Sequence, residues 1–394
     1  MMDVPVPLPT PSPTARRKRV TESVRAWLYI LPAGLLMLVI TMFPQLYQMW
    51  MAFTDYRLAN LRFNIFNSET WEKFAPPIVW FDNFVKVLTS DLAIENYDFV
   101  RLLKFNVTWT MANVFFHVIL GVVIALALNN KVLFGRKFYR AVFVLPWAIP
   151  GLIIAFTWRN MFDRRFGAIN QIISRINTAF GTAFPTDNRW LDATEPPGGG
   201  GPGIVLSLVV ILPLLIMVLN SLYKARMPFL LKLLPVPIIA WVVAEMFKMI
   251  VISPMAFWAV LIANIWLGWP FMTVIATGAL QSIPEELYEA ARMDGATGWQ
   301  QLVNITLPLL RPAMLPAIMV GTIWTFNNFN VIFFITQGGP FGRTELLVTQ
   351  AYKLVFTQRL YGVAAAFSIV VFFVLLIITL LQNRVTRATE AYYE

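Results

Sequence analysis

Hydrophobic and polar positions along this chain form long alternating blocks. Apolar runs of about 20 residues, the length a helix needs to cross the hydrocarbon of a bilayer, are separated by polar segments. The runs lie at 26–53, 105–129, 141–158, 204–223, 233–252, 255–279, 312–336 and 361–382. The strand alternation typical of membrane barrels is absent, so helices are the spanning elements. The pattern predicts an all-α polytopic membrane protein with about eight spans.

Composition agrees with this prediction and excludes several functions. Of 394 residues, 58% are hydrophobic and 13% are charged, which is far too apolar for a soluble domain. There is no cysteine and His117 is the single histidine, so disulfides, thiolate catalysis and cysteine or histidine metal sites are excluded. No cofactor, no metal site and no catalytic residues are predicted. The net charge of +10 is scattered through the loops, which favours anionic lipid over nucleic acid as its counterpart.

The positions of Lys and Arg predict the orientation, because these residues resist translocation. The best indicator is a short loop that holds four cations and no acid: Lys131, Arg136, Lys137 and Arg140. An even number of spans then places both termini in the cytoplasm, with a disordered basic tail at 1–25 and a second tail at 386–394. The run 26–53 is too long for the core of a signal peptide, so we expect it to remain as the first span, followed by an outer loop at 54–104.

The polar segment after the sixth apolar run predicts two short helices. Ser282 and Pro284 are typical of a helix start. Gly295 suits the positive φ that ends a helix, and Thr297 followed by Gln300 forms a capping box that begins the next one. We therefore expect an elbow of two helices that meet at the glycine.

The first helix of this elbow presents one narrow apolar face. Leu287, Ala290 and Ala291 stand at i, i+3 and i+4, and the alanines allow close approach of a partner. Residues alone leave two interpretations open. The helix either lies on the membrane surface or docks against a separate protein.

The elbow, within the loop 280–311, resembles the EAA signature of permease subunits from bacterial ATP-binding-cassette importers. The matching positions are Glu289, Ala290, Ala291, Gly295, Ile305, Leu307 and Pro308. The resemblance is closest to the larger maltose-type permease of the carbohydrate uptake family. Further matches, in order along the chain, are Leu145–Pro150, Asn264–Pro270, Phe326–Phe329 and Gly338–Pro340.

The resemblance implies a six-helix permease core, here formed by 105–195 and 253–385, in the bacterial cytoplasmic membrane. It also implies that the elbow is a coupling helix seated in an ATPase subunit. The chain contains no GxxxxGK[ST] motif for binding ATP phosphates, so hydrolysis is expected on a partner. The implied partners are a second permease subunit, two ATP-binding subunits and an external sugar-binding protein.

Polar side chains at membrane depth are candidates for a sugar site. Asn264, Leu267, Gly268 and Phe271 fall at i, i+3, i+4 and i+7, and a second group includes Trp324, Asn327 and Asn328 on one helical face. Amides match sugar hydroxyls and aromatic rings cover the apolar face of a pyranose, although Asn also joins helices to one another. The resemblance implies these substrate contacts: Asn264, Leu267, Gly268, Phe271, Trp324, Thr325 and Asn328.

One segment departs from the family pattern. Residues 196–252 contain two extra apolar runs separated by Lys224, Arg226 and Lys232, which predicts an inserted transmembrane hairpin. A re-entrant or membrane-surface structure is the alternative.

Three other polar side chains lie within the apolar runs and are expected to have structural roles. His117 is expected to make a bond between helices rather than to relay protons, and Glu245 and Lys248 are expected to neutralise one another. An ion-coupled secondary transporter is the alternative function, because it would need such titratable groups along its path.

Overall fold

The computed structural model describes residues 13–64, 67–130, 133–224 and 236–390. These residues are predominantly helical, and the one β pairing among them is an isolated bridge between Thr54 and Ile78. The chain divides into two compact units: Met1–Phe84 with Leu360–Ile369, and Val85–Arg359 with Val370–Glu394. The all-α prediction is confirmed for the described part of the chain.

The first unit contains one long helix and a small folded segment. Helix α1 (Pro13–Met37) continues through a π-helical turn (Leu38–Met42) into α2 (Phe43–Ala52). Its stretch Val24–Ala52 is long and apolar enough to span a membrane, and its most apolar part has no buried residue. After it come short helical turns at Leu58–Arg62 and Ser68–Thr70 and helix α3 (Trp71–Phe74). An apolar helix with so many exposed side chains is expected to lie in lipid rather than in water.

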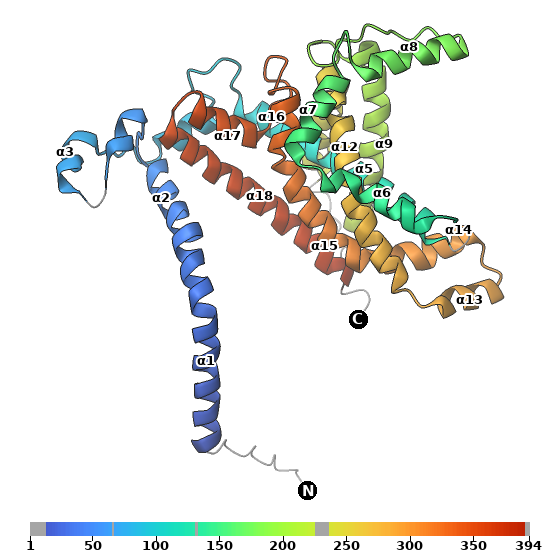
Figure 1. Ribbon diagram of the computed structural model, residues 1–394, viewed down its shortest axis with the longest axis horizontal. Coiled ribbons are helices and arrows are strands. Elements are labelled where there is room, and N and C mark those ends of the chain that lie inside the picture. Colours follow the sequence, from blue (N-terminus) through green and yellow to red (C-terminus); the bar gives the residue numbers. More distant parts are fainter. Residues whose placement is uncertain (1–12, 65–66, 131–132, 225–235, 391–394) are drawn as a thin grey trace. The chain divides into compact units, whose positions relative to one another are not determined.

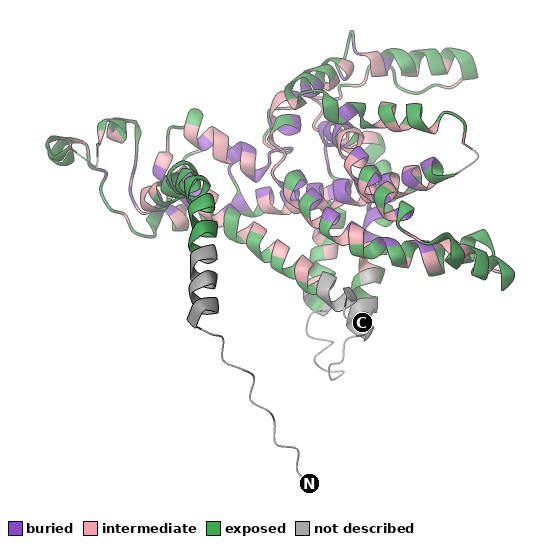
Figure 2. Ribbon diagram, turned by 60° about the horizontal axis from the view of Figure 1, so that its bottom comes forward, coloured by how far each residue is buried: buried purple, intermediate pink, exposed green. Residues whose placement is uncertain are grey.

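The second unit is a helical bundle built around α5 and α12 (Figure 1). Both pack against α15, and α16 packs against α7. Its helices are α5 (Phe99–Asn129), α6 (Arg136–Ala148), α7 (Gly151–Met161), α8 (Ala168–Phe180), α9 (Gly201–Lys224), α11 (Val236–Val251), α12 (Met255–Gln281), α13 (Glu285–Met293), α14 (Gly298–Gln301), α15 (Leu307–Phe326), α16 (Phe329–Ile335) and α17 (Leu347–Phe356). Helices α4 (Asp82–Leu88) and α18 (Tyr361–Glu390) begin in residues of the first unit and end in residues of the second. Figure 2 shows buried residues gathered where these helices pack, and exposed residues along α1 and α2 of the first unit.

The run predicted at 141–158 is a broken helix rather than a straight span. Helices α6 and α7 meet at an angle of 94°. Pro150 restricts the residue before it to extended backbone, and Ile149 has a ψ of 132°. The proline therefore ends α6 and starts α7 in a new direction.

The count of about eight spans is not confirmed. Six described helices are long and apolar enough to cross a membrane, and the bent pair raises the number to seven. The remaining candidate, α11, has 16 residues, so it rises about 24 Å, less than the hydrocarbon thickness. It packs against α9, whereas Arg226 and Lys232 lie outside the described residues. Of the tails predicted at 1–25 and 386–394, residues 1–12 and 391–394 also lie outside the described residues, while 13–25 belong to α1 and 386–390 to α18.

An ion pair that the sequence did not predict joins α11 to α5. Lys104 Nζ on α5 lies 2.7 Å from Glu245 Oε2 on α11. Lys104 is thus the salt-bridge partner of Glu245, and Lys248 adds a favourable charge interaction with the same carboxylate. Sequence spacing favoured Lys248 because it is on the same helix, but Lys104 comes from a neighbour whose packing no local pattern reveals.

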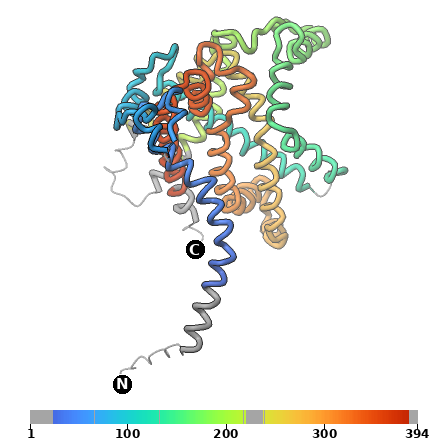
Figure 3. The backbone as a smooth tube through the Cα atoms, turned by 60° about the vertical axis from the view of Figure 1, so that its left-hand side comes forward, coloured from blue at the N-terminus to red at the C-terminus, as the bar shows by residue number. Residues whose placement is uncertain are grey.

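The elbow has the predicted two helices, and Figure 3 traces it from α12 through α13 and α14 into α15. Gly295 has a φ of +78°. The bonds Gly295 N to Arg292 O and Ala296 N to Ala291 O form the Schellman motif that ends α13. The Thr297 and Gln300 capping box is also confirmed.

One detail of the predicted elbow is wrong. Helix α13 begins after Pro284 with no side-chain cap. Ser282 instead donates its hydroxyl to Ala279 O at 2.8 Å, at the end of α12. A serine near a helix boundary bonds the preceding carbonyl or the following amide, and sequence does not decide between them.

Candidate functional site

One cavity in the second unit brings together every residue predicted to contact substrate. Its volume is about 140 Å³. The lining residues are His117, Trp147, Asn264, Leu267, Gly268, Phe271, Met272, Gly321, Trp324, Thr325 and Asn328. They come from α5, α6, α12, α15 and the turn between α15 and α16. Segments far apart in the sequence thus meet at one polar and aromatic pocket.

Three aromatic rings form one wall of this cavity. Trp147 stacks on Phe271 with ring centroids 5.3 Å apart and planes 21° from parallel. Trp324 is 5.2 Å from Phe271 and 6.1 Å from Trp147. Trp324 remains 55% exposed, so its face is available to a ligand. Such a wall suits the apolar face of a sugar ring.

A chain of side-chain amides crosses the bundle beside this wall. Asn328 Nδ2 donates to Asn264 Oδ1 at 2.6 Å, and Asn264 Nδ2 donates to Asn113 Oδ1 at 2.8 Å. Asn113 Nδ2 then donates to Trp109 O. Asn264 is buried and its amide joins three segments, which is the helix-joining role of intramembrane Asn. Asn328 is the partly exposed end of the chain.

The predicted helical face placed Asn327 beside Trp324 and Asn328, but Asn327 is not among the residues that line the cavity. Helix α15 ends at Phe326, and the Asn327 amide bonds back to Ile323 O at 3.3 Å. Periodicity predicted a continuous helix through these residues. The chain instead turns there, so the helical spacing no longer applies.

His117 makes the predicted bond between helices. Its Nε2 donates to the backbone carbonyl of Asn264 at 2.9 Å, which fixes the proton on Nε2. The imidazole occupies the space beside Gly268, where an added Cβ would overlap the ring. Glycine is therefore required at this α5–α12 contact to let the histidine reach its carbonyl.

Four residues of the cavity wall were not among the predicted substrate contacts: His117, Trp147, Met272 and Gly321. Trp147 was recognised within a family motif but not as part of the site, and His117 was assigned a joining role alone. Arg140, Phe143, Val144 and Trp147 share one face of α6 at i, i+3, i+4 and i+7. That periodicity would have found the face, but nothing local indicates that α6 turns it toward α12.

A second cavity, of about 300 Å³, is lined mainly by residues of α6 and α12. Its lining residues are Leu128, Arg140, Phe143, Val144, Pro270, Thr273, Val274, Thr277, Gly278 and Gln281. One face of α6 thus lines both cavities: Trp147 lines the first, and Arg140, Phe143 and Val144 line the second. The two cavities together follow α12 toward the elbow.

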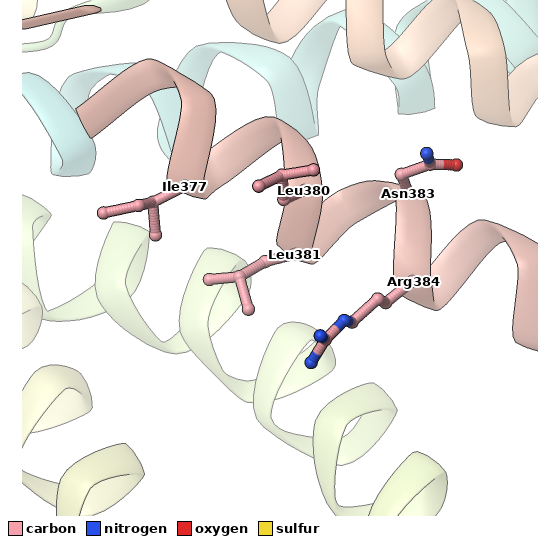
Figure 4. Close-up of a pocket in the computed structure, with 5 residues that line it drawn as sticks. All are labelled: Ile377, Leu380, Leu381, Asn383 and Arg384. Carbon is pink, nitrogen blue, oxygen red and sulfur yellow. The ribbon is translucent and has the colours of Figure 1, made fainter. Parts of the chain in front are cut away.

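A larger hollow of about 500 Å³ lies along α18 and holds none of the predicted residues. Figure 4 shows Leu381 and Arg384 on one side of the helix and Asn383 on the other. The described lining is mainly Ile377, Leu380 and Leu381. These three apolar side chains belong to a candidate membrane span, and Asn383 and Arg384 are the polar members of the described lining.

The elbow leaves several apolar side chains uncovered. Met293 is 89% exposed and Trp299 is 72% exposed. Tyr288 joins the elbow to the base of α15, because its hydroxyl lies 3.0 Å from Thr306 Oγ1. The predicted coupling residues divide accordingly: Glu289, Ala290, Ala291 and Gly295 lie at α13 and its end, Ile305 lies in the π-helical turn Leu302–Thr306, and Leu307 and Pro308 begin α15.

An exposed ion pair braces the segment between α7 and α9. Arg164 Nε donates to Asp187 Oδ1 at 2.6 Å, and a second guanidinium nitrogen contacts Oδ2. This bidentate bond lowers the pKa of the Asp187 carboxyl below its ordinary value. The Asp187 carboxyl is therefore ionised at neutral pH and available for this pair.

Comparison with known proteins identifies the family to which the chain is similar. The family described as binding-protein-dependent transport system inner membrane component matches residues 117–390. The maltodextrin transport system permease protein MdxF of Bacillus subtilis is 29% identical over 373 residues, which cover 92% of this chain and 69% of that protein. The trehalose/maltose transport system permease protein MalF of Thermococcus litoralis is 29% identical over 311 residues, covering 79% of this chain and 80% of that protein.

A solved structure shares the fold. It is the crystal structure of a bacterial ABC transporter involved in the import of the acidic polysaccharide alginate. The TM-score is 0.62 at 20% identity, with 94% of this chain and 98% of the solved chain covered. At this identity the likeness concerns the arrangement of helices alone.

Proposed function

Since the chain belongs to the family of binding-protein-dependent transport system inner membrane components, we propose that it forms half of the pathway of an ATP-driven oligosaccharide importer. A second permease subunit completes the pathway, and two ATP-binding subunits drive it. An external sugar-binding protein delivers the cargo. The transporter resides in the bacterial cytoplasmic membrane with both termini of this chain inside.

The observation that carries this proposal is the cavity at the aromatic wall. All seven residues proposed as substrate contacts line it, although they belong to segments about 60 residues apart in sequence. Trp324 and Phe271 offer ring faces, and Asn328 offers an amide. This combination of flat apolar surface and hydrogen-bonding groups suits a neutral saccharide. Permease relatives named for maltodextrin and for trehalose/maltose support the same cargo class.

The proposed coupling to an ATPase rests on the elbow. Its exposed Met293 and Trp299 offer apolar surface for a protein partner. The bond from Tyr288 to Thr306 connects a force on α13 to the base of α15. Helix α15 carries Trp324 and Thr325 of the cavity, so a displacement of the elbow reaches the proposed substrate contacts through one helix.

Ion coupling, the alternative function, finds less support. Among the described residues that line the first cavity, His117 is the one titratable group. Its Nε2 is bonded to a backbone carbonyl. Glu245 pairs with Lys104 at the inserted hairpin rather than at the cavity. A proton or sodium pathway requires a chain of exchangeable groups, and these residues do not provide one.

The proposal is tested by purification followed by reconstitution. We expect the tagged chain to co-purify from mild detergent with a second permease and an ATPase in fixed proportion. Vesicles holding the complex, the binding protein and enclosed ATP should take up maltodextrin, and vesicles without ATP should not. Uptake driven by a proton gradient with this chain alone would refute the importer.

Orientation is tested separately, using the absence of cysteine from the chain. Met293→Cys places a single thiol on the elbow, and Thr186→Cys places one on the segment between α7 and α9. A membrane-impermeant maleimide applied to intact spheroplasts should label Thr186→Cys alone. Labelling of Met293→Cys under the same conditions would reverse the proposed orientation.

A further inference from the structure

An exposed apolar segment, 78–81, lies beside the end of the first candidate span. Within it Ile78, Trp80 and Phe81 are 62%, 68% and 64% exposed. Trp80 has a φ of +51°, which a bulky side chain rarely adopts. Such a conformation persists only where the surrounding contacts hold it, so the segment presents its indole from a fixed backbone. Adjacent exposed apolar side chains of this kind indicate a contact surface.

Hydrogen bonds fix this segment to the end of the span. The candidate span ends at Ala52, and the last carbonyls of a helix have no donor within it. Val79 N and Trp80 N both donate to Phe53 O, at 2.9 and 3.1 Å. The buried amide of Asn83 donates to Ala52 O at 2.9 Å. The segment therefore caps the span and lies at the depth where the span ends.

A second candidate span fixes the same depth. The helical stretch Tyr361–Arg384 is long and apolar enough to cross a membrane, and its first turn belongs to the same compact unit as the segment. Gly362 N donates to Tyr56 O at 3.0 Å, and the bridge between Thr54 and Ile78 links that stretch of chain to the segment. The ends of two spans thus place the segment at the boundary between hydrocarbon and water.

Lipid rather than a protein partner is the occupant that these observations favour. The most apolar part of the first span has no buried residue, so packing against other helices of its unit does not set its depth. The other groups that position a span are aromatic and basic side chains at the membrane surface. Tryptophan suits that boundary, because its ring enters the acyl region while its N–H bonds to headgroups or water.

We propose that this segment is a membrane-interface anchor, in which Trp80 and Phe81 insert at the headgroup boundary and hold the first span at a fixed depth. The Phe81 ring is joined to the end of the span, because its centroid lies 5.5 Å from that of Phe53 and 6.1 Å from that of Phe84. The anchor does not depend on which cargo the protein carries, since it requires a lipid surface alone.

The first test measures depth, using the absence of cysteine from the chain. Ile78→Cys, Ile40→Cys and Thr186→Cys are each labelled with the fluorophore NBD, and the purified complex is reconstituted in phosphatidylcholine vesicles. Some of the lipid carries a quenching spin label, placed either near the headgroup or deep in the acyl chain. The shallow label should quench more strongly at Ile78, and the deep label should quench more strongly at Ile40, within the first span. Neither should quench at Thr186, in the segment between α7 and α9.

Two outcomes of this first test overturn the anchor. One is quenching at Ile78 as weak as that at Thr186, which would place the segment in water. The other is quenching at Ile78 that occurs with this chain alone and disappears in the complete complex, which would assign the surface to a protein partner.

The second test removes the aromatic rings. Trp80→Ser combined with Phe81→Ser should change the ratio of deep to shallow quenching at the Ile40 probe, because the span is no longer held. The matched control, Phe180→Ser combined with Phe184→Ser, removes two exposed rings from the segment between α7 and α9 and should leave the ratio unchanged. Equal ratios in wild type and both double variants refute the anchoring role. If the first double variant fails to assemble, the first test, made with the rings intact, still decides the lipid contact.

Discussion

Replacement of Gly268 by alanine tests the central contact of the cavity. The added Cβ would overlap the imidazole of His117. Relief of that overlap requires the ring to leave the Asn264 carbonyl, to which it now donates at 2.9 Å. The α5–α12 contact, on which the cavity is built, must then open. We expect Gly268→Ala to lower both the stability of the complex and the rate of sugar uptake.

The magnitude follows from the two interactions that change. Overpacking a filled contact costs about 1–3 kcal/mol. A lost hydrogen bond between membrane helices costs about 0.6 kcal/mol on average. The sum is about 1.6–3.6 kcal/mol of destabilisation. Without a clash, Gly268→Ala would stabilise the protein instead, because alanine is favoured over glycine in a helix by about 1 kcal/mol.

A double-mutant cycle separates the clash from other effects. His117→Ala removes the ring, so Gly268→Ala made on that background should cost little. The coupling energy between the two positions should be about 2 kcal/mol, roughly thirtyfold in an equilibrium constant. Thermal or denaturant unfolding of the purified complex measures the four proteins, and uptake is measured in vesicles. A Gly268→Ala protein as stable as wild type, or a coupling energy near zero, refutes the packing argument.

Three further changes test the elbow, the aromatic wall and the segment between α7 and α9. Gly295→Val introduces backbone strain of about 1–2 kcal/mol at a positive φ, although its Cβ meets open space. Sugar uptake should be lost, while an immunoblot should show the normal amount of protein in the membrane. Gly295→Asn should retain activity, because asparagine tolerates this φ. Trp324→Ala combined with Asn328→Ala should reduce maltodextrin uptake at least tenfold, a loss of about 1.4 kcal/mol of binding, and unchanged rate and specificity would remove both residues from the site. The lowered pKa of Asp187 means that its pairing with Arg164 stabilises the segment between α7 and α9 above the ordinary carboxyl pKa of about 3.9, and this contribution is lost as pH falls through the lowered value. Proteolysis of this segment should therefore accelerate below about pH 4 in wild type, and Asp187→Asn should be cleaved rapidly at all pH values.

Local features of the fold were predictable because their causes are local. The glycine that ends α13 and the capping box that starts α14 depend on residues within one turn of each other. Apolar run length located the long helices, since hydrocarbon thickness fixes how many residues cross it. The same rule failed for 141–158, where a proline redirects the chain, and left 233–252 undecided, where α11 is short.

The contacts between helices were not predictable in the same way. Periodicity identifies one face of α12 and one face of α6, but it does not say that these faces meet. The partner of Glu245 illustrates the difficulty, because Lys248 is near in sequence and Lys104 is near in space. The family resemblance supplied the pairing of α12 with α15 at the cavity, whereas Trp147 and Arg140 entered only once α6 was placed.

The amide chain separates two roles that the predicted site combined. Asn264 donates to Asn113 and accepts from Asn328, and its backbone carbonyl accepts from His117. Its side chain is buried, so it offers almost no accessible surface to a sugar hydroxyl. Asn328 is partly exposed and held in place by that bond. We therefore expect Asn264→Leu to impair uptake through loss of stability and a misplaced Asn328. An Asn328 substitution should instead raise the apparent KM for sugar and leave the melting temperature of the complex nearly unchanged. Identical effects of the two substitutions on stability and KM would contradict this division.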